Sequence, residues 1–153
     1  MGLTLLKSEI LIYNYTSHSV PPKKFFEKII NFSLKQLKEK EKISLALVFV
    51  DSFAIKKLNS YWRKKDYPPT VLSFPLKEKK KEELDGVKIL GDIFLCPSEI
   101  EKQAKERNLN LRDFYLMLLV HSLLHLYGFT HETERKQRQM EKLEKLIISL
   151  IKF

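Results

Sequence analysis

The stretch NLRDFYLMLLVHSLLHLYGFTH (residues 110–131) contains three of the four histidines of this chain: His121, His125 and His131. The residues before them are mostly apolar and predict a long buried helix. Residues four apart on a helix share one face, with Cβ atoms about 5–6 Å apart, so His121 and His125 can point at one metal ion. Gly128 lets the chain leave the helix in a left-handed turn, and His131 can then return as a third ligand.

Three histidine ligands leave one position of a tetrahedral zinc ion open, as in catalytic rather than structural sites. We therefore expect one Zn²⁺ ion as cofactor, although imidazole also binds nickel, copper and iron. A fourth ligand from Asp92, Cys96 or His18 would close the site, and the spacing leaves this alternative open. We expect Asp92 to be a buried hydrogen-bonding partner, Cys96 to pack at the end of a strand and His18 to lie in an exposed loop.

The whole chain, residues 1–153, is predicted to form a single α+β domain, because its length suits one domain with a buried core. Its apolar content of 44% argues against disorder. Patterns of apolar residues predict strands near residues 9–15, 43–50, 71–74 and 87–95. Helices are predicted near residues 21–40, 51–63 and 99–107, from residue 110 through the helical histidines, and over residues 133–153. We expect a small mixed β-sheet packed with several helices, a metal site on a central helix and a solvated loop at residues 76–83.

The charge of the chain is strongly positive, because 28 Lys and Arg residues outnumber 19 Asp and Glu residues and give a net charge of +9. Such a charge favours polyanionic partners, nucleic acid first. Charged residues interrupt every apolar run well before membrane-spanning length, so no membrane association is expected. The single cysteine fits a reducing compartment.

The histidine segment resembles that of the YbeY family, bacterial rRNA maturation factors described as metal-dependent endoribonucleases. The family pattern is H-G-x-L-H-L-x-G-Y-D-H, and this chain agrees with it at residues 121, 124, 125, 126, 128 and 131. Three positions depart: Ser122, Phe129 and Thr130 replace the usual Gly, Tyr and Asp. All three ligands are kept, whereas the usual aspartate is missing from its place beside the third ligand.

Two further segments carry the same resemblance. Residues 58–66 fit the family pattern L-N-x-x-x-R-x-x-D, residues 71–75 read V-L-S-F-P, and residues 90–93 give a weaker match. The resemblance implies that Arg63 is a functionally important, catalytic arginine. A guanidinium group suits that role, because it is permanently charged and can bind two phosphate oxygens at once. Lys64 and Lys65 are expected to be residues of a solvated turn.

The resemblance also implies a biological role. It predicts a zinc-dependent, single-strand-specific endoribonuclease that acts in 16S rRNA 3′-end maturation and small-subunit quality control. Its substrate would be an rRNA precursor or the small ribosomal subunit in the cytoplasm. A small-subunit ribosomal protein and an assembly GTPase are the expected partners. The nucleophile would be a metal-activated water molecule or a 2′-hydroxyl group of the RNA.

Two other functions compete with this prediction. The histidine spacing is also that of the metzincin peptidases, H-E-x-x-H-x-x-G-x-x-H, so a metallopeptidase with metzincin-like local geometry is an alternative. Ser122 stands where a peptidase needs a glutamate as general base, and Glu132 and Glu134 follow the third histidine instead. We therefore rank the nuclease above the peptidase. A non-catalytic RNA-binding module for ribosome assembly, with a structural metal ion, is the other alternative.

Overall fold

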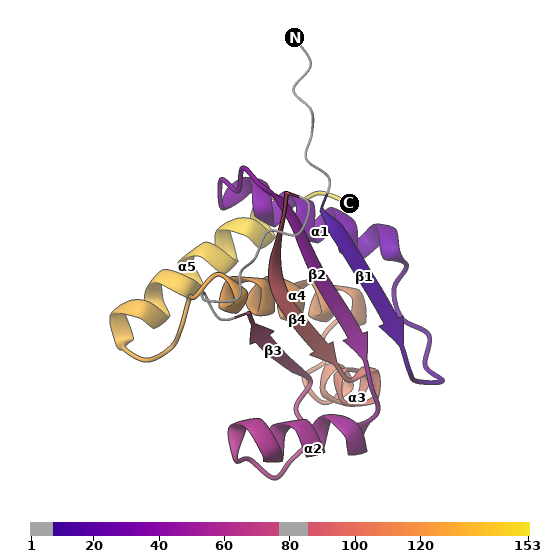
Figure 1. Cartoon of the computed structure of the whole chain (residues 1–153). Coiled ribbons are helices and arrows are strands. Elements are labelled where there is room, and N and C mark those ends of the chain that lie inside the picture. The colour runs from indigo at the N-terminus through magenta and orange to yellow at the C-terminus, as the bar shows by residue number, and fades with distance from the viewer. Residues whose placement is uncertain (1–7, 77–85) are drawn as a thin grey trace.

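The fold is built on a four-stranded mixed sheet, against which helices pack (Figure 1). The structure is a computed structural model, and it describes residues 8–76 and 86–153. The strands are β1 (Glu9–Asn14), β2 (Lys42–Phe49), β3 (Val71–Pro75) and β4 (Val87–Leu95). Their order in the sheet is β1-β2-β4-β3. Strands β1, β2 and β4 run parallel, whereas β3 is antiparallel to β4. This mixed sheet confirms the predicted α+β class.

Five helices accompany the sheet: α1 (Lys23–Gln36), α2 (Ser52–Arg63), α3 (Pro97–Glu106), α4 (Leu111–Leu126) and α5 (Glu134–Leu150). Two of these helices begin at a side-chain cap, because the Asp51 side chain accepts a hydrogen bond from the Ala54 amide and Asn110 accepts one from the Asp113 amide. Within the described ranges, no helix combines the length and apolar character needed to cross a membrane.

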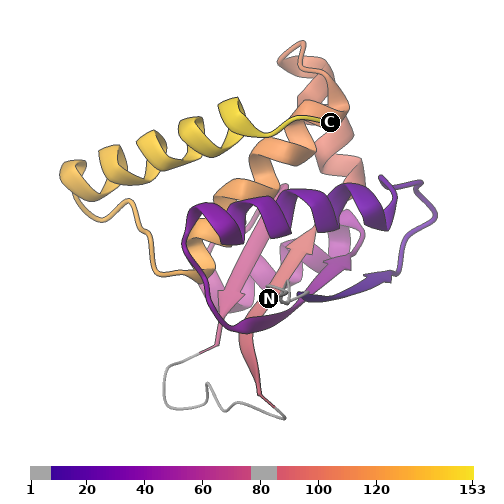
Figure 2. The ribbon, with the colours of Figure 1, turned by 90° about the horizontal axis from the view of Figure 1, so that it is seen from above.

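Helix α4 is the central helix of the molecule. It contacts α1, α3, α5 and the strands β3 and β4. Figures 1 and 2 show α1, α4 and α5 on the same side of the sheet, while α2 lies at the end toward which the parallel strands point. Because α4 is surrounded by other elements, most of its side chains are buried, and its last turns are held firmly in place.

The hydrophobic core lies between the sheet and these helices. Alternate residues of β2 point into it, and its last residue, Phe49, is fully buried. The Phe49 ring packs against Phe26 of α1 with ring centroids 5.6 Å apart, and Phe26 also meets Tyr115 of α4 at 6.1 Å. These aromatic contacts connect the sheet to the central helix through α1.

Strand β3 is held close to β4 by a glycine. Gly91 of β4 has a φ of +139°, and a Cβ atom on it would lie 2.2 Å from the carbonyl oxygen of Phe74. Only glycine allows this approach without displacing the backbone of β3. The register of β2 against β4 also shifts next to this point, between Ser44 and Leu45. Gly91 therefore helps to position β3, the strand that borders the candidate site.

Two helices are shorter than predicted. Helix α1 ends at Gln36 rather than near residue 40, because Lys38 adopts a left-handed conformation with a φ of +58°. Helix α5 ends at Leu150 rather than at residue 153. Two apolar residues of this helix, Leu146 and Leu150, are 48% and 46% exposed, so its apolar face is only partly covered. The loop predicted at residues 76–83 lies outside the described residues except for its first position.

Candidate metal centre

The three histidines identified in the sequence converge in the folded chain. His121 and His125 lie on the last turns of α4, and their ring centroids are 4.5 Å apart. The ring of His131, beyond the end of the helix, lies 5.2 Å from that of His121 and 5.1 Å from that of His125. One nitrogen atom from each ring lies within 4.8 Å of the others. The three side chains can therefore bind a single metal ion.

The turn after α4 brings the chain back toward the helix. Gly128 has a φ of +92°, its amide donates to the carbonyl of His125 at 3.0 Å, and the Phe129 amide donates to the carbonyl of Leu124 at 3.1 Å. These two bonds form a Schellman motif, which ends a helix through a left-handed residue. The predicted role of Gly128 is thereby confirmed, and His131 follows three residues later.

Two hydrogen bonds define the protonation of the helical histidines. Nδ1 of His121 lies 2.8 Å from the Glu144 carboxylate, and Nδ1 of His125 lies 2.8 Å from the Phe129 carbonyl oxygen. Because an ionised carboxylate and a carbonyl group only accept hydrogen bonds, both rings carry a proton at Nδ1. The Nε2 atoms of the two rings lie 3.0 Å apart, and a neutral ring with its proton on Nδ1 presents an Nε2 lone pair that can bind a metal ion.

This arrangement fits a divalent metal ion. Two lone pairs on atoms this close repel unless a cation lies near both, and tetrahedral zinc with bonds of about 2.0–2.1 Å separates its ligand nitrogens by about 3.3–3.4 Å. Burial, reinforced by the neighbouring His121, lowers the pKa of His125 and keeps this ring neutral, as a metal ligand must be. The set of imidazole nitrogens suits zinc and the other metals that prefer nitrogen ligands.

Glu144 was missed by the sequence analysis. It belongs to α5 and lies 23 residues beyond His121 in the chain. A signal was present, because Glu144 shares a helix face with Met140 and Ile147, which are both fully buried. A carboxylate on such a face needs a partner. The histidine that supplies this partner can be identified only once α5 is packed against α4.

Arg63 lies in the same pocket as the helical histidines. The described residues that line this pocket are Asn59, Arg63, Lys65, Tyr67, Pro69, Val71, Leu72, Ser73, Pro75, His121, Ser122, His125, Phe129 and Thr130. An Nη atom of Arg63 donates to the Ser73 carbonyl at 2.8 Å, and the guanidinium lies 5.7 Å from the centre of the Phe74 ring. One edge of the guanidinium is thus held by β3, which leaves further N–H donors for a ligand.

The described lining of this pocket contains Arg63 and Lys65 but no acidic residue. Ser122, at the position of the peptidase glutamate, lines the pocket and is 1% exposed. Glu132 is exposed and forms an ion pair with Lys136 at 3.3 Å. The pocket therefore suits an anionic ligand and offers no carboxylate in the position of a peptidase base.

Two polar residues of the pocket have distinct surroundings. Asn59 is buried, and its side chain donates to the Tyr67 carbonyl at 2.9 Å, which fixes the turn after α2. The hydroxyl oxygen of Thr130 is buried and has no hydrogen-bond partner among the described residues. Because buried polar atoms are normally hydrogen-bonded, a bound ligand is well placed to supply the missing partner of Thr130.

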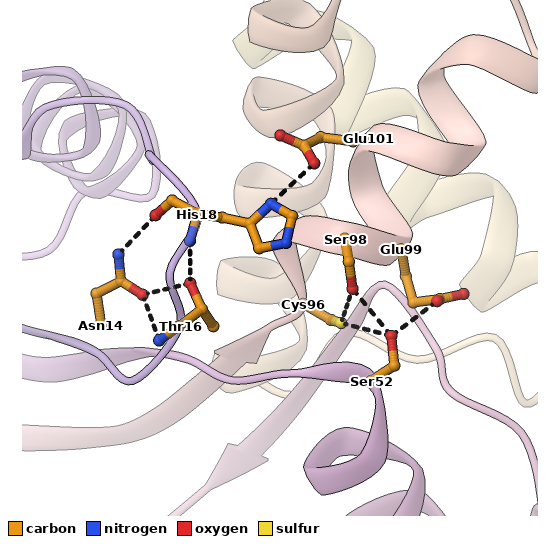
Figure 3. Close-up of polar contacts among 8 residues, drawn as sticks. All are labelled: Asn14, Thr16, His18, Ser52, Cys96, Ser98, Glu99 and Glu101. Atoms are coloured by element: carbon orange, nitrogen blue, oxygen red, sulfur yellow. Dashed lines mark hydrogen bonds and ion pairs between the residues drawn. The ribbon is translucent and has the colours of Figure 1, made fainter.

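None of the three alternative ligands joins the histidine cluster in the described part of the chain. His18 and Cys96 lie in a separate polar region, drawn in Figure 3, where His18 contacts Glu101 at 3.0 Å and the buried Cys96 thiol lies 3.3 Å from Ser98. Cys96 packs directly after β4, as predicted. Asp92 is exposed, so the expectation that it is buried was wrong. Partial desolvation nevertheless raises its pKa.

Several known proteins are similar to this chain. Residues 12–152 match the family model described as Endoribonuclease YbeY. The protein named Endoribonuclease YbeY from Chromobacterium violaceum is 35% identical, and the alignment covers 85% of this chain and 75% of that protein. The protein of the same name from Wolbachia pipientis is also 35% identical, and the alignment covers 97% of this chain and 95% of that protein. A solution structure from Thermotoga maritima has a TM-score of 0.61 at 27% identity, and the match covers 92% of this chain and 87% of that one.

Proposed function

Because the chain belongs to the YbeY endoribonuclease family, we propose that it is a metal-dependent endoribonuclease that cuts single-stranded RNA. The observation that carries this proposal is the pocket in which Arg63 and Lys65 lie beside His121 and His125, with no acidic residue in its described lining. Such a pocket attracts a polyanionic backbone. The whole chain, residues 1–153, is proposed to work as one hydrolase domain with metzincin-like geometry around the metal.

In this proposal His121, His125 and His131 hold one Zn²⁺ ion. When bound, zinc would act as a Lewis acid that neutralises negative charge developing on the phosphate and lowers the pKa of a bound water molecule. The chain contributes the orientation of the ligands, because Glu144 and the Phe129 carbonyl keep the ring protons on Nδ1 and leave Nε2 free. Three protein ligands would leave one position of the metal ion available for a substrate or a water molecule.

Arg63 is the proposed catalytic residue of the protein. Its free N–H groups would contact the non-bridging oxygens of the phosphate and stabilise their charge in the transition state. The hydrogen bond to the Ser73 carbonyl holds the guanidinium in place before the substrate arrives. Lys65, also in the pocket lining, would attract the phosphates on either side of the one that is cut.

Family membership supports the proposed biological role. We propose that the substrate is the precursor of 16S rRNA or the small ribosomal subunit, and that cleavage serves 3′-end maturation and quality control. A small-subunit ribosomal protein and an assembly GTPase are the proposed partners, and the cytoplasm is the proposed location. The net charge of +9 supports association with an rRNA-containing particle.

Elemental analysis of the purified protein, combined with cleavage of an rRNA precursor with and without a chelator, tests the proposal. We expect one zinc ion per chain and loss of cleavage after chelation. His125→Ala should lose bound metal and cleavage together. Arg63→Ala should keep the metal but cut RNA about 100-fold more slowly, since removing one donor to a developing anion has about this effect. Arg63→Lys is the matched control, because it keeps the charge but loses the planar fork.

Two results would reject the proposal. One is undiminished RNA cleavage by a His121→Ala, His125→Ala, His131→Ala triple variant in preparations free of other nucleases. The other is robust metal-dependent cleavage of casein without cleavage of RNA, which would favour the peptidase. Analysis of the RNA ends identifies the nucleophile, because attack by the neighbouring 2′-hydroxyl leaves a 2′,3′-cyclic phosphate and attack by water does not.

A further inference from the structure

Large aromatic side chains are exposed beside the pocket, at the end of α2 and in the turn that follows it. Tyr61 is 69% exposed, Trp62 is 61% exposed and Tyr67 is 51% exposed. Single exposed apolar residues are common, but a cluster of large rings on one surface marks a site of interaction. Together with Lys64 and Lys65, these three rings define what we call the aromatic rim.

The aromatic rim is continuous with the pocket. Tyr67 and Lys65 belong both to the rim and to the pocket lining, and Arg63 follows Trp62 directly in the chain. The rings of Tyr61 and Trp62 are 4.9 Å apart and nearly perpendicular, at 79°. A ligand that reaches the metal centre past Arg63 therefore passes exposed aromatic faces.

Neighbouring contacts hold the Trp62 and Tyr61 rings in place without covering them. The Trp62 ring meets Phe74 of β3 in an edge contact, with centroids 6.2 Å apart. The Nζ atom of Lys64 donates to the Tyr61 carbonyl at 3.2 Å and lies 5.8 Å from the centre of the Tyr61 ring. Because the rings are already ordered, binding a flat ligand against them loses little side-chain entropy.

The charge around the rim indicates which kind of partner it fits. Residues 52–67 contain five basic residues, at positions 56, 57, 63, 64 and 65, and one acidic residue, Asp66. Asp66 lies 3.9 Å from Lys56, so it offsets one of these five positive charges and leaves the region strongly basic. Protein interfaces are depleted in lysine, whereas sites for single-stranded nucleic acid combine lysine and arginine with aromatic faces on which bases stack.

We propose that the aromatic rim binds unpaired bases of single-stranded RNA by stacking, with Trp62 as the main stacking residue, and so guides the strand into the metal pocket. This inference rests on the proposed function, because it assigns to RNA the surface next to that same site. Paired bases are stacked on one another and cannot offer a face to Trp62, so the rim selects single strands over duplexes.

Trp62 is the only tryptophan of the chain, so its fluorescence reports on this ring alone. The full-length protein is titrated with a single-stranded oligoribonucleotide of about 12 residues, a length within the range that one binding surface covers. A chelator is present to prevent cleavage. We expect the single strand to quench Trp62 fluorescence and a blunt duplex of equal length to leave it unchanged. Equal quenching by the duplex, or none by the single strand, would overturn the proposal.

Variants test the same point by the anisotropy of labelled RNA. Trp62→Leu should weaken binding about 10-fold or more, the loss expected for one stacked base, and Trp62→Phe should restore most of the affinity. Tyr15→Leu is the control, because Tyr15 is 72% exposed but follows β1, outside the rim. Circular dichroism establishes that each variant is folded, and Tyr61→Leu provides a second variant of the rim with the same expected direction. Unaltered RNA affinity in both rim variants would overturn the proposal and favour a protein partner for this surface.

Failure of this inference can be told apart from failure of the proposed function. RNA cleavage by the metal-loaded protein, with full RNA affinity in the rim variants, would reject only the rim. Conversely, Trp62-dependent binding of single strands without any metal-dependent cleavage would reject the nuclease and keep the binding surface.

Discussion

At the scale of single residues, the two helical histidines differ in what orients their rings. His125 donates to a carbonyl oxygen of its own turn, at Phe129, whereas His121 donates to a charged carboxylate from another helix, at Glu144. The first contact depends only on the local turn. The second depends on how α5 packs against α4, and it places a negative charge behind the ligand, which strengthens the basicity of its Nε2 atom.

Glu144→Ala should therefore weaken metal binding about 10–100-fold, the range typical for the loss of a carboxylate behind a histidine ligand. Competition for zinc against a chromophoric chelator measures this affinity without reference to RNA. Glu141→Ala is the matched control, because Glu141 lies on the same helix, is exposed and contacts Gln137 rather than a histidine. Equal zinc affinity in the two variants would show that Glu144 has no part in orienting His121.

Among the helices and strands, a partly buried carboxylate outside the histidine cluster holds the end of α4. Glu39, between α1 and β2, accepts hydrogen bonds from the Tyr127 hydroxyl at 2.6 Å and from Lys88 of β4 at 3.1 Å. Burial disfavours the ionised form of Glu39, but the hydrogen bonds from Tyr127 and Lys88 outweigh this effect and lower its pKa below the ordinary value of 4.5. The carboxylate thus joins three elements beside the turn that carries the third histidine.

This contact predicts a pH-dependent stability. A carboxylate with a lowered pKa in the folded state stabilises the fold at pH values above its unfolded-state pKa, and this contribution is lost as the pH falls through the lower, folded-state pKa. Glu39→Gln should reduce the free energy of unfolding by about 1.5–3 kcal/mol at neutral pH. The difference from the wild type should shrink at pH values well below 4.5.

Urea unfolding at neutral and acidic pH measures both values for Glu39→Gln. Tyr127→Phe serves as a partial version of the same change, because it removes one hydrogen bond and leaves the ion pair with Lys88. A difference between wild type and Glu39→Gln that is identical at both pH values would mean that the ionised carboxylate contributes nothing to stability.

At the scale of the whole molecule, the net charge of +9 and the position of the pocket act together. In the proposed complex, the positive field would attract RNA without regard to its sequence, and Arg63 and Lys65 of the pocket would contact individual phosphates. Direct contacts with phosphates displace the counterions bound there. The number of such contacts determines how steeply RNA affinity depends on salt concentration.

Affinity for single-stranded RNA should fall linearly on a plot of log affinity against log salt concentration, with a slope of about −0.7 for each phosphate contacted. Lys65→Gln should make this slope less steep by about 0.7, because Lys65 lines the pocket. Lys24→Gln removes the same charge from an exposed position on α1 and is expected to leave the slope unchanged. Equal slopes in the two variants would remove Lys65 from the RNA contacts.

Features that arise within a few residues of chain can be predicted from the amino-acid pattern alone. The caps at Asp51 and Asn110, the left-handed turn at Gly128 and the shared face of His121 and His125 follow from local hydrogen bonds and helical periodicity. The resemblance to the YbeY family likewise depends only on motif spacing, and the comparisons confirmed it.

Contacts between residues that are distant in the chain become known only from the folded molecule. The pairing of His121 with Glu144, the bond from Arg63 to Ser73, and the burial or exposure of Asp92 and Leu146 depend on how helices and strands pack against one another. Periodicity states which face of an element is apolar, but it does not state which neighbour covers that face. That choice is made by the summed packing of the whole chain, which no single segment encodes.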